Sequence, residues 1–230
     1  MRIYDRLISL GLNCEISYHL TIYFGHIESS LFQWASIPAE QLIPVLKEPA
    51  RIYSQGIIEN PAANMWRCAV TSISFHGKHR PHELFDEDGS RNKERVLSEA
   101  KDTIARVKYL LEKFYNTARS EENKLYILGL HPSFCSNIVP VPFIQELFET
   151  LQTIAQNASL LVIAEKNLQT ELLPLDNNRN LFIRFLDKFA PQDKVAALDY
   201  IDVKNGNEIF SEFAPARIQE KKKIYKFEKQ

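Results

Sequence analysis

Four segments of the chain carry short, nearly unbroken runs of apolar residues, which are typical of strands buried on both faces. They are 7–12, 124–130, 160–164 and 181–186. A fifth segment, 67–75, is rich in β-branched residues and also predicts a strand. We expect 7–12, 124–130 and 160–164 to lie in one sheet.

Between these runs, apolar residues recur at helical spacing. The spacing predicts helices over 15–24 and 93–115, one that opens at Pro142, and a shorter one over 36–46. Because strands alternate with helices, we predict an α/β protein with a mixed or mostly parallel sheet flanked by helices. The 230 residues are expected to form a single domain, 1–230, with a charged, frayed tail at 220–230.

Composition narrows the class of protein. Hydrophobic residues make up 45% and charged residues 25%, as in ordinary globular proteins, and the net charge of -1 gives no field that attracts nucleic acid. No apolar run approaches the roughly 20 residues that span a bilayer, and no secretory leader is seen. Glycine-rich phosphate-binding motifs are also absent. We therefore expect no nucleic-acid partner, no membrane span, no cofactor and no metal.

The cysteines supply the clearest candidate chemistry. Cys14, Cys68 and Cys135 are too few, and odd in number, for a disulfide framework, which favours a reducing, cytoplasmic location. Cys14 follows the predicted strand 7–12 and the expected N-cap Asn13, so it should stand in the first turn of a helix at the sheet edge. Helix N–H groups there favour the thiolate, and we expect a lowered pKa and a nucleophilic sulfur. The alternative is a buried cysteine that packs as a small apolar side chain, the role expected for Cys68.

Three short motifs resemble a bacterial family described as papain-like cysteine peptidases, a domain of unknown function. The motifs are SLGLNC at 9–14, LFQW at 31–34 and Phe75-His76. The resemblance covers roughly the first 130 residues. It implies that Cys14 is the nucleophile and His76 its base, with Asn13 and Trp34 lining the site.

The sequence departs from the family's pattern at two positions. Gln33 stands where the family has an aspartate, and Gly77 stands where an acidic residue often follows the histidine. Because it occupies the position of the family's aspartate, Gln33 is the third catalytic residue that the resemblance implies. It can hydrogen-bond but cannot stabilise an imidazolium by charge.

Other histidines leave alternatives open. His131 follows the predicted strand 124–130 and should reach the same sheet edge as Cys14, which makes it a rival base. The three histidines at 76, 79 and 82, with carboxylates close behind, are an alternative zinc site, although they match no standard ligand spacing.

The function expected from these residues is cysteine-dependent hydrolysis or acyl transfer on a peptide or other acyl substrate. Two alternatives belong to other classes. One is a transferase or accessory enzyme of cell-surface polysaccharide assembly, which the low glycine count disfavours. The other is a non-catalytic binding module on the same fold, which Gln33 favours.

Overall fold

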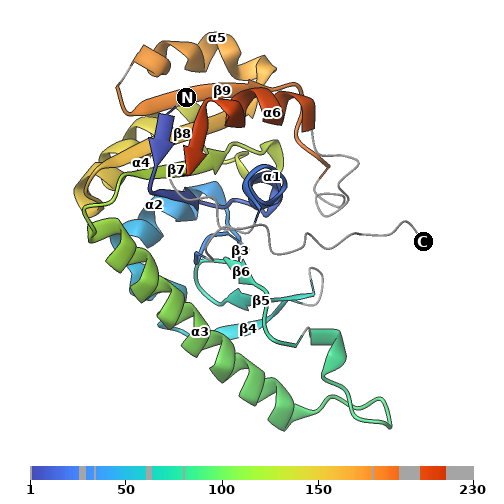
Figure 1. Cartoon of the computed structure of the whole chain (residues 1–230). Coiled ribbons are helices and arrows are strands. Elements are labelled where there is room, and N and C mark those ends of the chain that lie inside the picture. Colours follow the sequence, from blue (N-terminus) through green and yellow to red (C-terminus); the bar gives the residue numbers. More distant parts are fainter. Residues whose placement is uncertain are drawn as a thin grey trace.

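A computed structural model of the chain describes residues 2–25, 30–33, 35–60, 64–79, 81–177, 179–191 and 203–215. Within these ranges lie a parallel four-stranded sheet, an antiparallel four-stranded sheet and a two-stranded parallel ribbon (Figure 1). The ribbon pairs β1 (Arg2–Tyr4) with β10 (Phe213–Pro215). Among the described helices, none is both long and apolar enough to cross a bilayer.

The parallel sheet is built from the four segments with apolar runs. They are β2 (Arg6–Ser9), β7 (Lys124–Gly129), β8 (Ala158–Glu165) and β9 (Leu181–Leu186), in this spatial order. Each neighbouring pair is parallel, so the prediction that the first three segments share one sheet is confirmed. Apolar cores cover both faces of the sheet, which explains why its strands carry continuous apolar runs.

Helices cover both faces of this sheet, because alternate side chains of each strand point to opposite sides. The helices are α1 (Glu15–Phe24), α2 (Ala39–Lys47), α3 (Lys93–Arg119), α4 (Pro140–Ile154), α5 (Gln169–Leu172) and α6 (Val203–Ser211). In β8, Leu160 packs in the core with α2, α3, α4 and α5, whereas Leu161 packs with α1 and α6. The spatial order of the strands follows their order in the chain. Parallel strands in this order need crossovers that all step in one direction, and the helices α3, α4 and α5 accordingly share one core on the same face.

The antiparallel sheet lies beside the N-terminal half of α3 (Figure 1). Its strands are β3 (Ala35–Ser36), β6 (Ser74–Phe75), β5 (Met65–Cys68) and β4 (Ile57–Asn60), in this spatial order. The prediction of one strand over 67–75 is wrong, because the chain turns back after Cys68. The Ser72 amide donates to the Cys68 carbonyl at 3.2 Å, and Ser72 has a φ of 57°. The β-branched residues that suggested a strand, Val70, Thr71 and Ile73, lie in the connection between β5 and β6, so their enrichment does not reveal the turn.

Three other predicted boundaries shift. α2 begins at Ala39 instead of 36, because residues 35–36 belong to β3. α3 continues to Arg119, and α4 begins at Pro140, two residues before the expected Pro142. The predicted tail at 220–230 lies outside the described residues.

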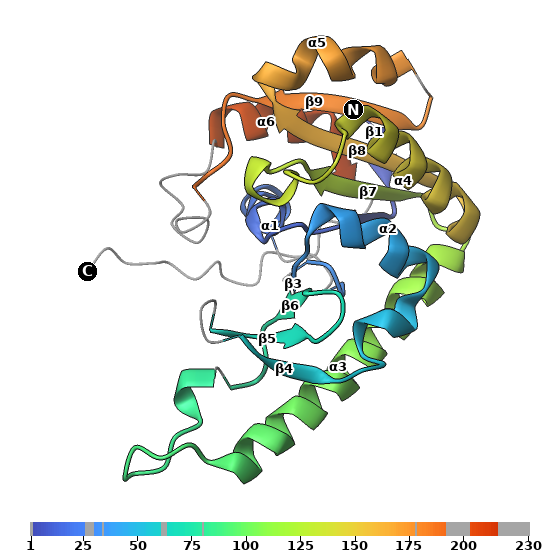
Figure 2. The same cartoon turned by 180° about the vertical axis from the view of Figure 1, so that it is seen from behind.

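One apolar core joins the two sheets. It includes Trp66 and Phe75 of the antiparallel sheet, Tyr126 of β7, and Phe114 of α3. The ring of Phe32, which precedes β3, meets Phe114 edge to face with centroids 5.1 Å apart. α3 runs past both sheets, as Figures 1 and 2 show, and its apolar stripe holds the antiparallel sheet against the rest of the molecule.

Candidate active site

Cys14 stands at the start of α1, directly after a sharp turn that follows β2. Gly11 lies in this turn with a φ of 81°, and a Cβ there would lie 2.7 Å from the carbonyl oxygen of Phe32. The turn therefore requires glycine both for its backbone angle and for its close approach. Cys14 is the N-cap residue of α1, a place expected for Asn13. Asn13 instead accepts the backbone N–H of Glu15 through Oδ1 at 3.1 Å.

Burial decides the ionisation of Cys14. The side chain is half-buried, and desolvation raises the pKa of its thiol to about 11. A hydrogen bond from the backbone acts in the opposite sense but is weaker, and the neighbouring Glu15 raises the pKa further. The predicted lowering of the Cys14 pKa is therefore wrong. The residue rests as a neutral thiol at neutral pH, so nucleophilic attack needs a base that removes the proton.

The antiparallel sheet brings the segments of Gln33 and His76 to the same end of a strand pair. β3 and β6 are antiparallel, with Ala35 opposite Phe75. Gln33 lies just before β3, and His76 directly follows β6. The hydroxyl of Ser17, one turn along α1 from Cys14, donates to the Gln33 carbonyl at 2.5 Å. The first turn of α1 is thereby bound to the segment that enters β3, and the partner strand β6 leads into His76.

Gln33 and His76 differ in exposure. Gln33 is 3% exposed, and its side-chain oxygen accepts the backbone N–H of Ser30 at 3.4 Å, so it contributes to its own turn. His76 is exposed, and its backbone carbonyl accepts a hydrogen bond from Nη1 of Arg106 at 3.2 Å. Ser30, His76 and Arg106 also line one small pocket between the segment before β3 and α3.

His131, the rival base, uses both of its ring nitrogens inside the protein. It is buried, and Nε2 lies 2.8 Å from the carbonyl oxygen of Ala190. Nδ1 accepts the backbone N–H of Ser133 at 3.1 Å. These bonds assign the neutral tautomer with the proton on Nε2, and neither nitrogen is left to accept a thiol proton. The geometry thus gives His131 a structural role at the carboxyl edge of the sheet, where Glu15 holds the Ala190 amide at 3.0 Å.

Asn13 and Trp34 are the two residues that the resemblance implies line the site. Asn13 is 8% exposed, and its Nδ2 has no hydrogen-bond partner among the described residues. It directly precedes Cys14 in the chain, and its site-lining role stays a prediction. Trp34 lies outside the described residues.

The histidine-rich loop does not assemble the alternative zinc site. Nδ1 of His79 bonds Glu99 at 2.7 Å, whereas Nδ1 of His82 bonds the side-chain amide of Asn64 at 2.5 Å. Across the described ranges, no three histidine, cysteine or carboxylate side chains are placed to hold one metal ion.

The other two cysteines differ from Cys14 in their surroundings. Cys68 is fully buried, and its thiol lies 3.4 Å from the carbonyl oxygen of Arg51, which fits the structural role expected for it. Cys135 is half-buried, and burial together with the charge of Glu40 raises the pKa of its thiol to about 12.

Sequence reasoning missed the side chains that hold the segment after β6. Arg106 and Glu99 both reach this segment from α3. A signal was available, because Glu99 falls on the same helical stripe as the apolar residues Val96 and Val107. A carboxylate on an apolar stripe is expected to have a buried partner.

In comparisons with known proteins, no family model, no curated protein and no solved structure matches this chain.

Proposed function

We propose that this protein is a cysteine-dependent hydrolase or acyl transferase, with Cys14 as the nucleophile and His76 as the general base. One observation carries the proposal. A half-buried thiol opens α1, and Ser17 in the first turn of α1 is hydrogen-bonded to Gln33, just before β3, the strand that pairs with β6 and so lies beside the segment of His76. The papain-like resemblance of the SLGLNC segment supports the same assignment.

The proposed reaction begins with attack of the Cys14 sulfur on an acyl carbonyl. An S–C bond forms while His76 accepts the thiol proton, and the tetrahedral intermediate expels the leaving group with that proton to give a thioester. Water or an acceptor nucleophile then attacks the thioester and releases the acyl group. The N–H groups at the start of α1 are the natural donors to the oxyanion.

The raised pKa of Cys14 shapes this mechanism. A preformed thiolate–imidazolium pair would need a lowered thiol pKa, whereas this thiol has a pKa of about 11. The proton must therefore leave as the sulfur attacks, so the base contributes to the rate directly. Gln33, with an amide in place of a carboxylate, does not stabilise the imidazolium by charge, which also favours a mechanism without a stable ion pair.

Acylation by p-nitrophenyl acetate tests the proposal. We expect release of p-nitrophenolate with transfer of the acetyl group to Cys14, located by mass spectrometry. Cys14→Ala should abolish this transfer, and His76→Ala should slow it by roughly 100-fold, the usual contribution of a general base. Cys135→Ala and His82→Ala are matched controls, since they remove the other half-buried thiol and an exposed histidine of the same loop.

The same experiment separates the proposal from its alternative. A non-catalytic binding module is the second candidate, and the observation in its favour is the raised pKa of the desolvated Cys14 thiol. Acetylation that is absent, or equal at Cys14 and Cys135, would favour the binding module. A rate that depends on Cys14 but not on His76 would assign the base to another residue.

A further inference from the structure

A buried carboxylate holds the loop that follows His76. Glu99 of α3 is 4% exposed. Its Oε1 accepts the backbone N–H groups of Lys78 at 2.6 Å and His79 at 3.1 Å. Its Oε2 lies 2.7 Å from Nδ1 of the His79 ring. One side chain thus fixes two consecutive peptide groups and an imidazole, all within three residues of His76.

Gly77 allows this arrangement. A Cβ at this position would lie 2.5 Å from Nε1 of Trp66 and 2.6 Å from Oε1 of Glu99. The Trp66 indole also donates to the carbonyl of His79 at 3.0 Å. The backbone at 77 therefore passes directly between an indole and a carboxylate, and no side chain fits there without displacing one of them. The carboxylate beside this loop comes from α3 instead of from position 77.

The loop is attached to α3 on both sides of Gly77. Arg106 donates to the His76 carbonyl, and Glu99 binds the two residues that follow Gly77. Seven positions separate Arg106 from Glu99, or about two turns of helix, so both lie on the same side of α3. A rigid helix thereby fixes the backbone that directly follows the proposed base.

Glu99 has the charge that this role requires. Burial by itself raises the pKa of the carboxyl, but the hydrogen bonds from His79 and Lys78 outweigh burial, and the net effect is a lowered pKa. Glu99 is therefore ionised at neutral pH. An ionised acceptor makes stronger hydrogen bonds to backbone N–H groups than a neutral one.

We propose that Glu99 is the positioning residue of this site, and that it acts through the loop 77–79 to hold His76 where the imidazole meets the Cys14 thiol. The inference rests on the proposed function. It assigns no contact between Glu99 and the reacting atoms, so its effect on the reaction should pass entirely through His76.

A double-mutant cycle tests this dependence, with p-nitrophenyl acetate as the probe and the full chain as the protein. Glu99→Gln keeps the size of the side chain but removes its charge and one of its acceptor oxygens. In the wild-type background we expect it to slow acetylation of Cys14 by roughly tenfold, because small displacements of a catalytic group are costly. In the His76→Ala background the same substitution should have no further effect.

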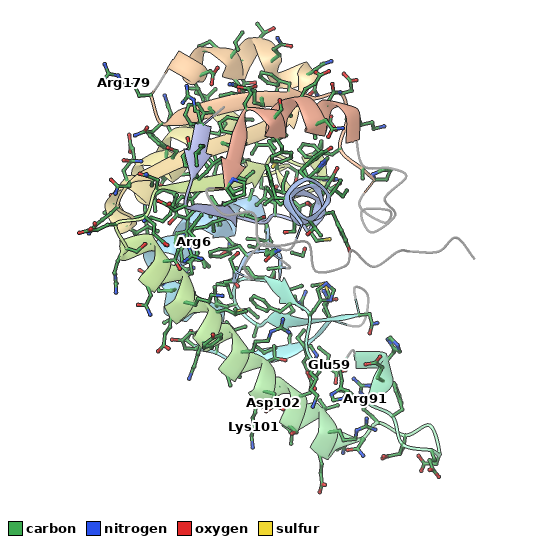
Figure 3. All side chains as sticks on the ribbon, in the orientation of Figure 1. Arg6, Glu59, Arg91, Lys101, Asp102 and Arg179 are labelled. Atoms are coloured by element: carbon green, nitrogen blue, oxygen red, sulfur yellow. The ribbon has the colours of Figure 1, made fainter. Side chains whose placement is uncertain are left out.

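Two further variants keep the test decisive. Asp102→Asn removes an exposed carboxylate of the same helix (Figure 3) and should leave the rate unchanged in both backgrounds. If Glu99→Gln does not fold, as judged by circular dichroism, Arg106→Ala takes its place. Arg106 is exposed and binds the loop on the other side of Gly77, so the same dependence on His76 is expected.

The failures of the two proposals are distinguishable. If His76→Ala slows acetylation, but Glu99→Gln slows it equally with and without His76, the positioning role is overturned and the proposed function stands. If His76→Ala has no effect while Cys14 is still acetylated, the base assignment fails and the positioning role fails with it.

Discussion

At the residue scale, the ionisation of Cys14 is a competition between two local effects. The start of α1 offers N–H groups that favour a thiolate, whereas half-burial removes the water that would solvate it. Desolvation is the larger effect and leaves a pKa of about 11. A cysteine at a helix start is thus reactive only if the surrounding chain also leaves it solvated or supplies a base.

Alkylation by iodoacetamide across pH measures this balance. The labelling rate of Cys14 should rise about tenfold per pH unit from pH 7 to pH 10, because only the thiolate reacts. Cys135, whose pKa is raised to about 12, should react about tenfold more slowly than Cys14 at the same pH. Cys68 should remain unlabelled in the folded protein, since it is fully buried. A plateau of Cys14 labelling near pH 8, read by mass spectrometry, would contradict the raised pKa.

His131 should affect stability and not acylation. Replacing it with alanine leaves the Ala190 carbonyl and the Ser133 amide without their partner. Unpaired buried polar groups cost about 1–3 kcal/mol each, so the free energy of unfolding in urea should fall by about 2 kcal/mol or more. The acetylation rate of the folded variant should stay near the wild-type value. If His131→Ala slows acetylation while the free energy of unfolding is unchanged, His131 and not His76 would be assigned as the base.

At the element scale, the turn between β2 and α1 determines where Cys14 stands. Gly11 and Gly89 have nearly the same backbone angle, with φ of 81° and 80°. They differ in surroundings, because a Cβ on Gly11 would meet the Phe32 carbonyl oxygen at 2.7 Å, whereas one on Gly89 has no neighbour within 4 Å. Comparing the two glycines therefore separates the destabilisation caused by the backbone angle from the destabilisation caused by steric contact of an added Cβ.

Alanine substitution at the two glycines is the corresponding experiment. Gly89→Ala should lower the free energy of unfolding by about 1 kcal/mol, the usual cost of a left-handed non-glycine residue. Gly11→Ala should lower the free energy of unfolding by at least about 2 kcal/mol more than Gly89→Ala does, because the turn or the segment at Phe32 must also move. Urea unfolding measures both values. Equal losses would mean that the turn tolerates the displacement.

At the scale of the whole molecule, ion pairs join segments that lie far apart in the sequence. Arg6 of β2 binds Glu122, which precedes β7, at 3.0 Å. Arg184 of β9 binds Glu212, which precedes β10, at 2.6 Å. Arg91 pairs with Glu59 of β4, the edge strand of the antiparallel sheet, and Figure 3 labels both side chains. These pairs lie at the periphery, so each contributes modestly to stability at neutral pH.

The lowered pKa values of Glu122, Glu212 and Glu99 contribute to the response of the fold to acid. The Arg6 hydrogen bond lowers the pKa of Glu122, and the Arg184 hydrogen bond lowers that of Glu212. Although burial acts to raise it, the pKa of Glu99 is also lowered, by its hydrogen bonds. Each group has a lower pKa folded than unfolded, so its stabilisation is complete above the ordinary value of 4.5 and is lost as pH falls below it.

We therefore expect these groups to lower the free energy of unfolding by a modest amount as the pH falls below about 4.5. Glu212→Gln should make this decline shallower, because one carboxylate no longer takes up a proton on unfolding. Urea unfolding at several pH values from 7 to 3 checks both statements. A free energy of unfolding that stays constant down to pH 3 would show that these ion pairs do not contribute to stability.

The sequence by itself determined the elements whose pattern is local. Apolar runs located the four parallel strands, helical spacing located α3, and the order of strand, turn and helix placed Cys14 at the start of α1. Such patterns report which side chains face the interior, and this depends on residues a few positions apart. The sequence did not reveal the hairpin of β5 and β6, because the β-branched residues that predicted a strand, Val70, Thr71 and Ile73, lie in the connection between its arms.

The tertiary structure decided the chemistry of the site. The pKa of Cys14 depends on how much of the chain surrounds the sulfur, and His131 is bonded to Ala190, 59 positions away. Glu99 reaches the loop after His76 from a helix about 20 positions further along. Desolvation and hydrogen bonds are set by neighbours in space, whereas periodicity reports only neighbours in sequence. The sequence could therefore nominate a cysteine and a histidine, but only the fold determined whether the thiol is charged and which histidine has its ring nitrogens already bound.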